Sequence, residues 1–175
     1  MVIVEDESDL PAPSSGIITL DTTTVYQVVG SVNVTSKIEL NGSTLKGNNP
    51  SADKLTYTPT TGELFTGSTG GRVMELTLSA PNGTALLFNV DDTVGNQAFN
   101  VLTCTITSCV DVGLLKGFLL AQFRFCLFQN NTTGIEFEDC TIANSFGSVW
   151  FSGNTGTMET YTGTFDLIAK YVGLS

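Results

Sequence analysis

The sequence contains no histidine, and this absence narrows the chemistry open to it. Without an imidazole the chain cannot build a serine–histidine or cysteine–histidine nucleophile pair, nor a zinc site of cysteines and histidines. The four cysteines (Cys104, Cys109, Cys126 and Cys140) also lack the close paired spacing of a cysteine-only zinc site. We therefore predict no metal, no cofactor and no catalytic residue, and we expect the four thiols to be reduced, with Cys104, Cys126 and Cys140 buried.

Basic residues are scarce as well. Seven Lys and Arg stand against 17 Asp and Glu, giving a formal net charge of -10, and the seven are scattered along the chain. Binding to phosphates requires a concentrated basic patch, so nucleic acid is excluded as a partner.

Long apolar runs and a basic-then-apolar leader are both missing. A membrane-spanning helix needs about 20 consecutive apolar residues. No membrane partner and no classical secretion signal are predicted.

The sequence does contain a short repeated phrase of alternating apolar residues, a turn and a further apolar pair. Copies span 76–88, 102–115, 123–137 and 137–151, with Leu78, Ile106, Phe128 and Ile142 at the anchor position. A cysteine or leucine lies two residues before each anchor. The predicted core ladder is Leu76, Leu78, Cys104, Ile106, Cys126, Phe128, Cys140 and Ile142.

Such a unit cannot bury its apolar face alone, so serial copies predict stacked coils with a shared interior. The fold class is therefore all-β, a short parallel β-helix, and the alternative is an antiparallel β-sandwich or jelly roll. Anchor spacings of 28 and 22 residues suit one coil each, but the third spacing of 14 does not. Either Ile142 lies on another face of its coil, or Trp150 is the true successor of Phe128.

The rest of the chain divides around this repeat. Residues 1–15 carry four acids followed by two prolines and are predicted to form an extended acidic arm. Residues 16–157 form the β-helix domain, in which 48–72, rich in Pro, Gly, Ser and Thr, is expected to be an irregular loop or a poorly regular coil. Residues 158–175 are a terminal coil, or a strand that leaves the stack and caps it.

Residues 16–47, GIITLDTTTVYQVVGSVNVTSKIELNGSTLKG, carry a resemblance. This run, with its N-G-x-x-L-x-G turn, resembles the first coils of right-handed β-helix proteins of the pectin-lyase-like type, in particular bacteriophage virion proteins such as tail spikes. The resemblance spans about residues 16–153 and implies a right-handed helix. It also implies a virion location, with synthesis in the host cytoplasm, and a homotrimer of parallel solenoids.

Enzymes of that type cleave glycans with clustered carboxylates. The candidates here are Asp91, Asp92, Asp111, Glu136, Glu138 and Asp139. Glu136 and Glu138 alternate with apolar residues, so they should point outward from a strand. Convergence of the six in one groove would favour an enzyme, and dispersal over several faces would remove the active site.

Aromatic residues are concentrated between 118 and 151, where eight rings exceed the one or two per level that about two coil interiors are expected to hold. The excess predicts an interface with a second copy, and the candidate residues are Phe118, Phe123, Phe125, Phe146, Trp150 and Phe151.

The predicted function is a non-enzymatic structural component of a phage particle: a tail spike, a tail fibre or a head decoration. It should assemble with copies of itself and with other virion proteins, and a cell-surface glycan is a further candidate partner. The alternatives are a carbohydrate-active or carbohydrate-binding β-helix protein and a bacterial adhesin module.

Overall fold

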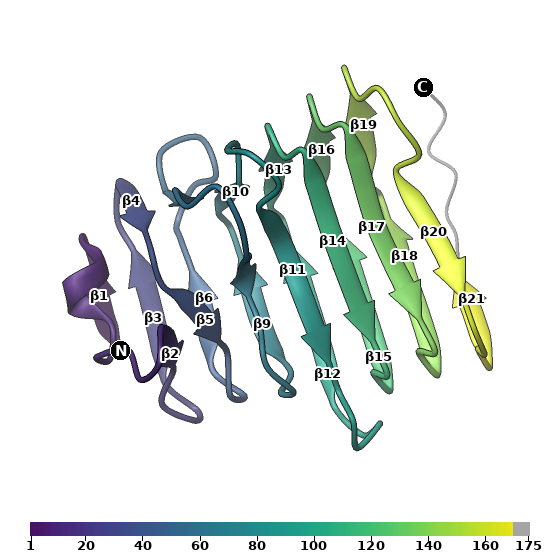
Figure 1. Ribbon diagram of the computed structural model, residues 1–175, viewed down its shortest axis with the longest axis horizontal. Coiled ribbons are helices and arrows are strands. Elements are labelled where there is room, and N and C mark those ends of the chain that lie inside the picture. The colour runs from purple at the N-terminus through teal and green to yellow at the C-terminus, as the bar shows by residue number, and fades with distance from the viewer. Residues whose placement is uncertain (170–175) are drawn as a thin grey trace.

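The computed structural model describes residues 1–169, with side-chain surroundings for all of these except 144–147 and 169. The chain forms a parallel β-solenoid of about seven turns. The coils stack along one axis from β1 at one end to β20 and β21 at the other (Figure 1). Within residues 1–169 every strand pairing is parallel, and the single antiparallel contact is an isolated bridge between Ser14 and Ile17. The predicted all-β solenoid is confirmed, and the antiparallel sandwich is excluded.

From β3 to β20 each coil contributes one strand to each of three sheets, and the chain visits sheet A, sheet C and sheet B in that order; the first coil has β1 and β2 but no strand in sheet C. Sheet A contains β1 (Val2–Val4), β3 (Val25–Val28), β6 (Thr44–Lys46), β9 (Gly71–Met74), β12 (Ala98–Leu102), β15 (Leu120–Arg124), β18 (Ile142–Gly147) and β21 (Leu167–Ala169). Sheet C contains β4 (Ser31–Val34), β7 (Lys54–Tyr57), β10 (Thr77–Ser79), β13 (Thr105–Thr107), β16 (Leu127–Gln129) and β19 (Trp150–Ser152). Sheet B contains β2 (Ile17–Thr19), β5 (Lys37–Glu39), β8 (Glu63–Phe65), β11 (Leu86–Asp91), β14 (Asp111–Lys116), β17 (Thr133–Glu138) and β20 (Glu159–Thr162).

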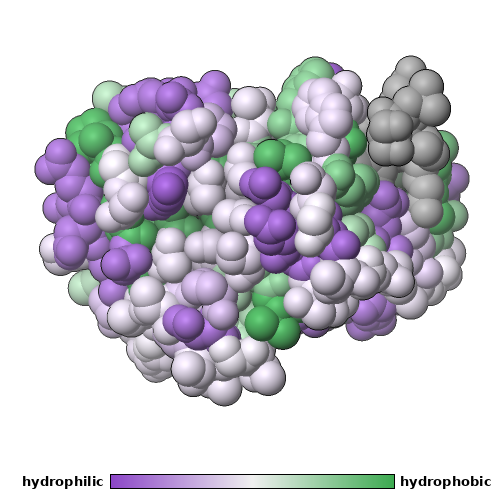
Figure 2. Space-filling model, turned by 90° about the horizontal axis from the view of Figure 1, so that it is seen from above, coloured by the Kyte–Doolittle hydropathy of each residue, from purple (hydrophilic) through white to green (hydrophobic). Residues whose placement is uncertain are grey.

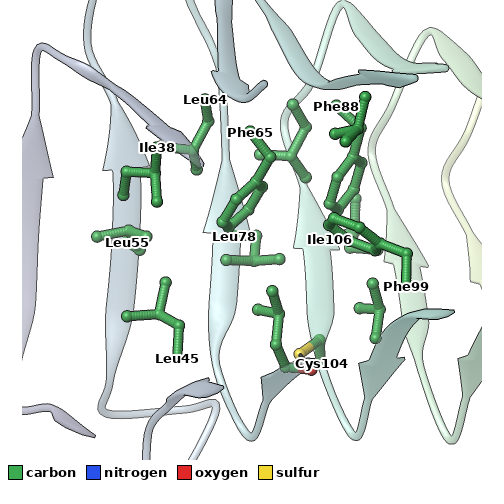
Figure 3. Close-up of a cluster of buried hydrophobic side chains, with 14 of the residues drawn as sticks. Ile38, Leu45, Leu55, Leu64, Phe65, Leu78, Phe88, Phe99, Cys104 and Ile106 are labelled. Carbon is green, nitrogen blue, oxygen red and sulfur yellow. Dashed lines mark hydrogen bonds between the residues drawn. The ribbon is translucent and has the colours of Figure 1, made fainter. Parts of the chain in front are cut away.

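The interior is a set of apolar ladders, because alternate residues of each strand point inward and equivalent residues of successive coils lie in register. In sheet C the ladder runs through Val32, Leu55, Leu78, Ile106 and Phe128, all buried. Several of these residues appear among the stacked side chains of Figure 3. The predicted inward positions of Leu78, Ile106 and Phe128 are thus correct.

Many corners between sheets have the same construction: a residue with positive φ turns the chain, and the next residue points into the core. All four cysteines occupy this inward place, after Thr103 (φ 55°), Ser108 (φ 59°), Phe125 (φ 53°) and Asp139 (φ 51°). Cys104 and Cys126 lie between sheets A and C, where Leu76 is their buried counterpart. Cys109 lies between sheets C and B, and Cys140 between sheets B and A. Cys140 is therefore buried as predicted, but on a different ladder from Cys104 and Cys126.

Ile142 was wrongly assigned to the core ladder. It lies in sheet A, where it pairs with Leu120 and Leu167, and it is only half-buried because its neighbour Ala143 takes the inward position. The successor of Phe128 is Phe151, whereas Trp150 pairs with Leu127 on the outer face. The spacing of 14 residues therefore joins two different sheets.

Residues 48–72 are not an irregular loop. They supply β7, β8 and the start of β9, and Leu55, Tyr57, Leu64 and Phe65 are buried. The polar residues that flank these strands form turns, which are stabilised by hydrogen bonds within the coil and to the neighbouring coil. The Asp53 carboxylate, for example, accepts the backbone N–H groups of Gly30, Asn48 and Asn49.

The N-terminal arm is folded onto the stack and is not simply extended. β1 pairs with β3, and the Glu7 carboxylate of a short 3-10 helix, η1 (Glu7–Asp9), accepts the N–H groups of Thr35 and Ser36. Leu10 is buried beneath this helix. Three of the four acids that suggested a solvated segment, Asp6, Glu7 and Asp9, therefore serve as hydrogen-bond acceptors. At the other end, β20 and β21 continue sheets B and A as far as residue 169.

Candidate functional site

Two of the six predicted interface residues are buried. Phe118 follows the corner residue Gly117 (φ 73°) and turns inward, and Phe123 lies among Phe88, Phe128 and Phe137 with ring centroids 5.6 to 6.0 Å apart. The prediction was wrong for both because it underestimated how many rings the interior accepts. Edge-to-face contacts between successive coils let phenylalanines fill the stack efficiently.

Three predicted interface residues are partly exposed. Phe125 is 51% exposed and Trp150 is 56% exposed. Phe151, which continues the inward ladder, contacts the Phe128 ring at 5.4 Å and remains half-exposed. The side chain of Phe146 lies outside the described residues. We call Phe125 and Trp150 the aromatic ridge, because both lie along the boundary of sheets A and C, in successive coils.

Phe125 occupies an unusual conformation for an aromatic residue. Its φ of 53° lies in the left-handed region, which is costly for bulky residues. Other coils place Glu75, Thr103 or Ser148 at this corner, so the corner itself does not require a ring. The guanidinium of Arg124 lies 5.4 Å from the Phe125 ring centroid, which holds the ring on the surface.

The six carboxylates separate into two groups. Asp92 and Asp139 are corner residues that stabilise turns, since Asp92 accepts the N–H groups of Val94, Gly95 and Gln97, and Asp139 accepts that of Thr164. The other four, Asp91, Asp111, Glu136 and Glu138, belong to the strands of sheet B. Glu138 forms an ion pair with Lys116 at 2.8 Å.

Asp111 and Glu136 share a shallow depression of about 220 Å³ on sheet B, together with Leu86, Asn89 and Leu114. Burial is the main reason that the pKa of Asp111 is raised, and the charge of Glu136 adds to it. Asp111 accepts the N–H of Gly113, and Glu136 accepts the hydroxyl of Thr162 at 2.7 Å. Sheet B therefore carries a depression in which two of the candidate carboxylates come together.

An asparagine ladder, which sequence reasoning missed, lies at the corner between sheets C and B. The Asn131 side chain accepts the N–H of Cys109 and donates to the carbonyl of Ile106. One coil later the Asn154 side chain repeats both bonds with Asn131 and Phe128. The 23-residue spacing of these two asparagines, equal to that between Phe128 and Phe151, was the available signal.

The four cysteines are free and buried. Each thiol lies within hydrogen-bonding distance of the carbonyl two residues earlier, and burial raises the pKa of Cys126 to about 11 and that of Cys109 to about 12. Within the described part of the chain, no group of three or more metal-ligating side chains gathers around one point.

We expect titration of the unfolded protein, without reductant, to count four thiols. The folded protein should react slowly at all four, because a buried thiol with a high pKa provides almost no thiolate at neutral pH. A count below four, or rapid reaction of the folded protein, would contradict this assignment.

Comparisons with protein-family models, with curated proteins and with solved structures find no match. Within residues 1–169 no helix is long and apolar enough to cross a membrane. The class that the fold defines is the parallel β-solenoid with three sheets.

Proposed function

We propose that the protein is a non-enzymatic structural component of a phage particle that assembles with copies of itself and with other virion proteins. A solenoid whose interior is filled by apolar ladders is a stiff rod, suited to a spike, a fibre or a head decoration. The location in a virion and the trimeric state rest on the resemblance of residues 16–47 to tail-spike coils. The proposal of self-assembly rests on exposed residues of this chain.

The observation that supports self-assembly is the aromatic ridge. Phe125 and Trp150 are each more than half exposed, and Phe125 adopts a costly backbone conformation that leaves its ring on the surface. Burial of a large apolar side chain contributes about 1.5 to 3 kcal/mol before the cost of association is subtracted. Strained, exposed aromatics favour a role in binding over a role in folding.

Sedimentation velocity at micromolar concentration tests this proposal. The wild-type protein should be an oligomer, and the double substitution Phe125→Ser/Trp150→Ser should shift it towards monomer without unfolding it. The matched control is Val94→Ser/Val110→Ser, because Val94 (70% exposed) and Val110 are surface residues away from the ridge. A wild-type monomer would contradict self-assembly, and an equal effect of the control would remove the ridge from the interface.

A second candidate, glycan binding or cleavage, is favoured by the depression that Asp111 and Glu136 share. A carboxyl with a raised pKa beside a second carboxylate is the arrangement used for acid–base cleavage of glycosidic bonds. Asp111→Asn and Glu136→Gln should each abolish release of reducing ends from a susceptible glycan, whereas Glu138→Gln should retain it. If the wild-type protein neither binds nor cleaves glycans of the host surface, this candidate is lost.

A further inference from the structure

Charged residues are sorted by sheet. The strands of sheet A contain three bases, Lys46, Arg72 and Arg124, and no Asp or Glu, and those of sheet C contain Lys54 alone. The strands of sheet B contain two bases, Lys37 and Lys116, and seven acids. These acids are Glu39, Glu63, Asp91, Asp111, Glu136, Glu138 and Glu159. A protein of net charge -10 thus has one face that carries only bases and one that is strongly acidic.

The bases of sheet A have no ionic partner within the described chain. The two ion pairs found there, Lys37–Glu63 and Lys116–Glu138, both join strands of sheet B. Arg72 and Arg124 are exposed, and the Arg124 guanidinium lies over the face of the Phe125 ring. Fixed, unpaired cations on a β-sheet face are suited to an acidic surface with matching spacing.

Sheet A also presents apolar residues beside these cations. Leu120, Ile142 and Leu167 form one row in register, half-buried to exposed. Met74 and Leu102 continue a second row that ends at Arg124. Apolar rows with arginines among them are typical of protein interfaces.

Sheet B has the complementary features. Its depression combines two apolar side chains, Leu86 and Leu114, with the carboxylates of Asp111 and Glu136. Neither carboxylate contacts a cation in the described chain; their hydrogen bonds come from Gly113 and Thr162. A guanidinium entering this depression would find carboxylate acceptors on two neighbouring strands, and arginine pairs with carboxylates through two parallel hydrogen bonds.

We propose that sheet A of one copy packs against sheet B of a second copy, with Arg124 or Arg72 of the first copy reaching Asp111 and Glu136 of the second. This inference rests on the proposed self-assembly and names the surfaces that carry it. Electrostatic repulsion determines which faces can meet, because two copies of net charge -10 repel each other unless a basic face meets an acidic one. A twofold contact of sheet A with sheet A, or of sheet B with sheet B, would place charges of the same sign opposite each other. The contact therefore joins two different surfaces, sheet A of one copy and sheet B of the next. Repetition of such a contact gives a closed ring or an open filament.

Charge reversal tests the pairing. The sheet-A variant is Arg72→Glu/Arg124→Glu, and the sheet-B variant is Asp111→Lys/Glu136→Lys. Each alone should raise the dissociation constant at least about thirtyfold, because an interfacial charge loses its partner. In an equimolar mixture every contact between unlike variants again joins unlike faces, so the two variants should associate with each other. A ring of three copies keeps one contact between like variants, so the expected result is a mixed complex of at least one copy of each variant, and complete recovery is expected only for a filament or an even-numbered ring. Lys54→Glu on sheet C is the control and should assemble as the wild type does.

The outcomes separate this inference from the proposed function. If the wild type assembles but either variant assembles equally well, the pairing of faces is wrong while self-assembly stands. Two monomeric variants that form no mixed complex when combined also overturn it. If the wild-type protein is a monomer, both the pairing of faces and the proposed self-assembly are wrong. The basic face would then suit an acidic partner other than a second copy. If the sheet-B variant does not fold, the double variant Asp111→Asn/Glu136→Gln replaces it. This variant should also have a higher dissociation constant for self-assembly than the wild type.

Discussion

Replacing Ile106 with aspartate should prevent folding, whereas the same replacement at Ile142 should leave the protein folded. Ile106 is fully buried between Leu78 and Phe128 of the neighbouring coils. An unpaired charge there costs several kcal/mol, comparable with the whole stability of a domain, which is about 5 to 15 kcal/mol. Ile142 lies on the outer face of sheet A, where water can solvate a carboxylate.

The measurement is soluble yield followed by denaturant unfolding monitored by circular dichroism. Ile106→Asp should give no cooperative transition, and Ile142→Asp should keep the wild-type slope with a modest shift in midpoint. The comparison is well matched, because both changes place the same residue on a strand of the same solenoid. Equal loss of folding in the two variants would show that the inner and outer faces of sheet A have been assigned incorrectly.

Asn131→Ala should destabilise the protein strongly for a polar-to-alanine substitution at a corner. The side chain is almost completely buried, accepts the N–H of Cys109 and donates to the carbonyl of Ile106. Its removal leaves the N–H of Cys109 without its acceptor, and an unsatisfied buried group costs about 1 to 3 kcal/mol.

Asn33→Ala is the control for this substitution, because Asn33 is an exposed asparagine on a strand of sheet C. Its removal should change the free energy of unfolding by less than about 0.5 kcal/mol. Denaturant unfolding of the two variants measures the difference directly. Similar midpoints for Asn131→Ala and the wild type would mean that water replaces the ladder at this corner.

The candidate sites illustrate how far residue patterns reach. Alternation along the strand that contains Glu136 and Glu138 placed both carboxylates on the outside, and the structure agrees. That Asp111 shares a depression with Glu136 was not predictable, because the two are 25 residues apart and meet only through the register of β14 with β17. The sorting of charge between sheets A and B depends on the same register.

The exposed aromatics were only partly predictable for a related reason. Counting rings identified the right region but not the right residues. Phe123 and Phe125 would point to the same side of a continuous strand, but Phe125 lies at a corner after the strand ends, so Phe123 is buried and Phe125 is exposed. A residue with positive φ at position 125 ends the alternation of β15 and restarts it with Cys126 inside. No sequence pattern marks such a corner when the turning residue is a phenylalanine.

The sequence by itself determined that this chain is built of short strands that bury one face, and it favoured a parallel stack over an antiparallel sandwich. Period-2 alternation repeated at intervals of one coil lets stacked coils share one apolar interior. Only the tertiary structure decided which sheet each strand joins, and therefore that Ile142 faces outward while Phe151 follows Phe128. The physical reason is that the alternation of a strand is local, whereas the register between coils is set at the corners. The corner residues, such as Thr103, Phe125 and Asp139, share a left-handed backbone conformation but no residue type, so the sequence does not mark them.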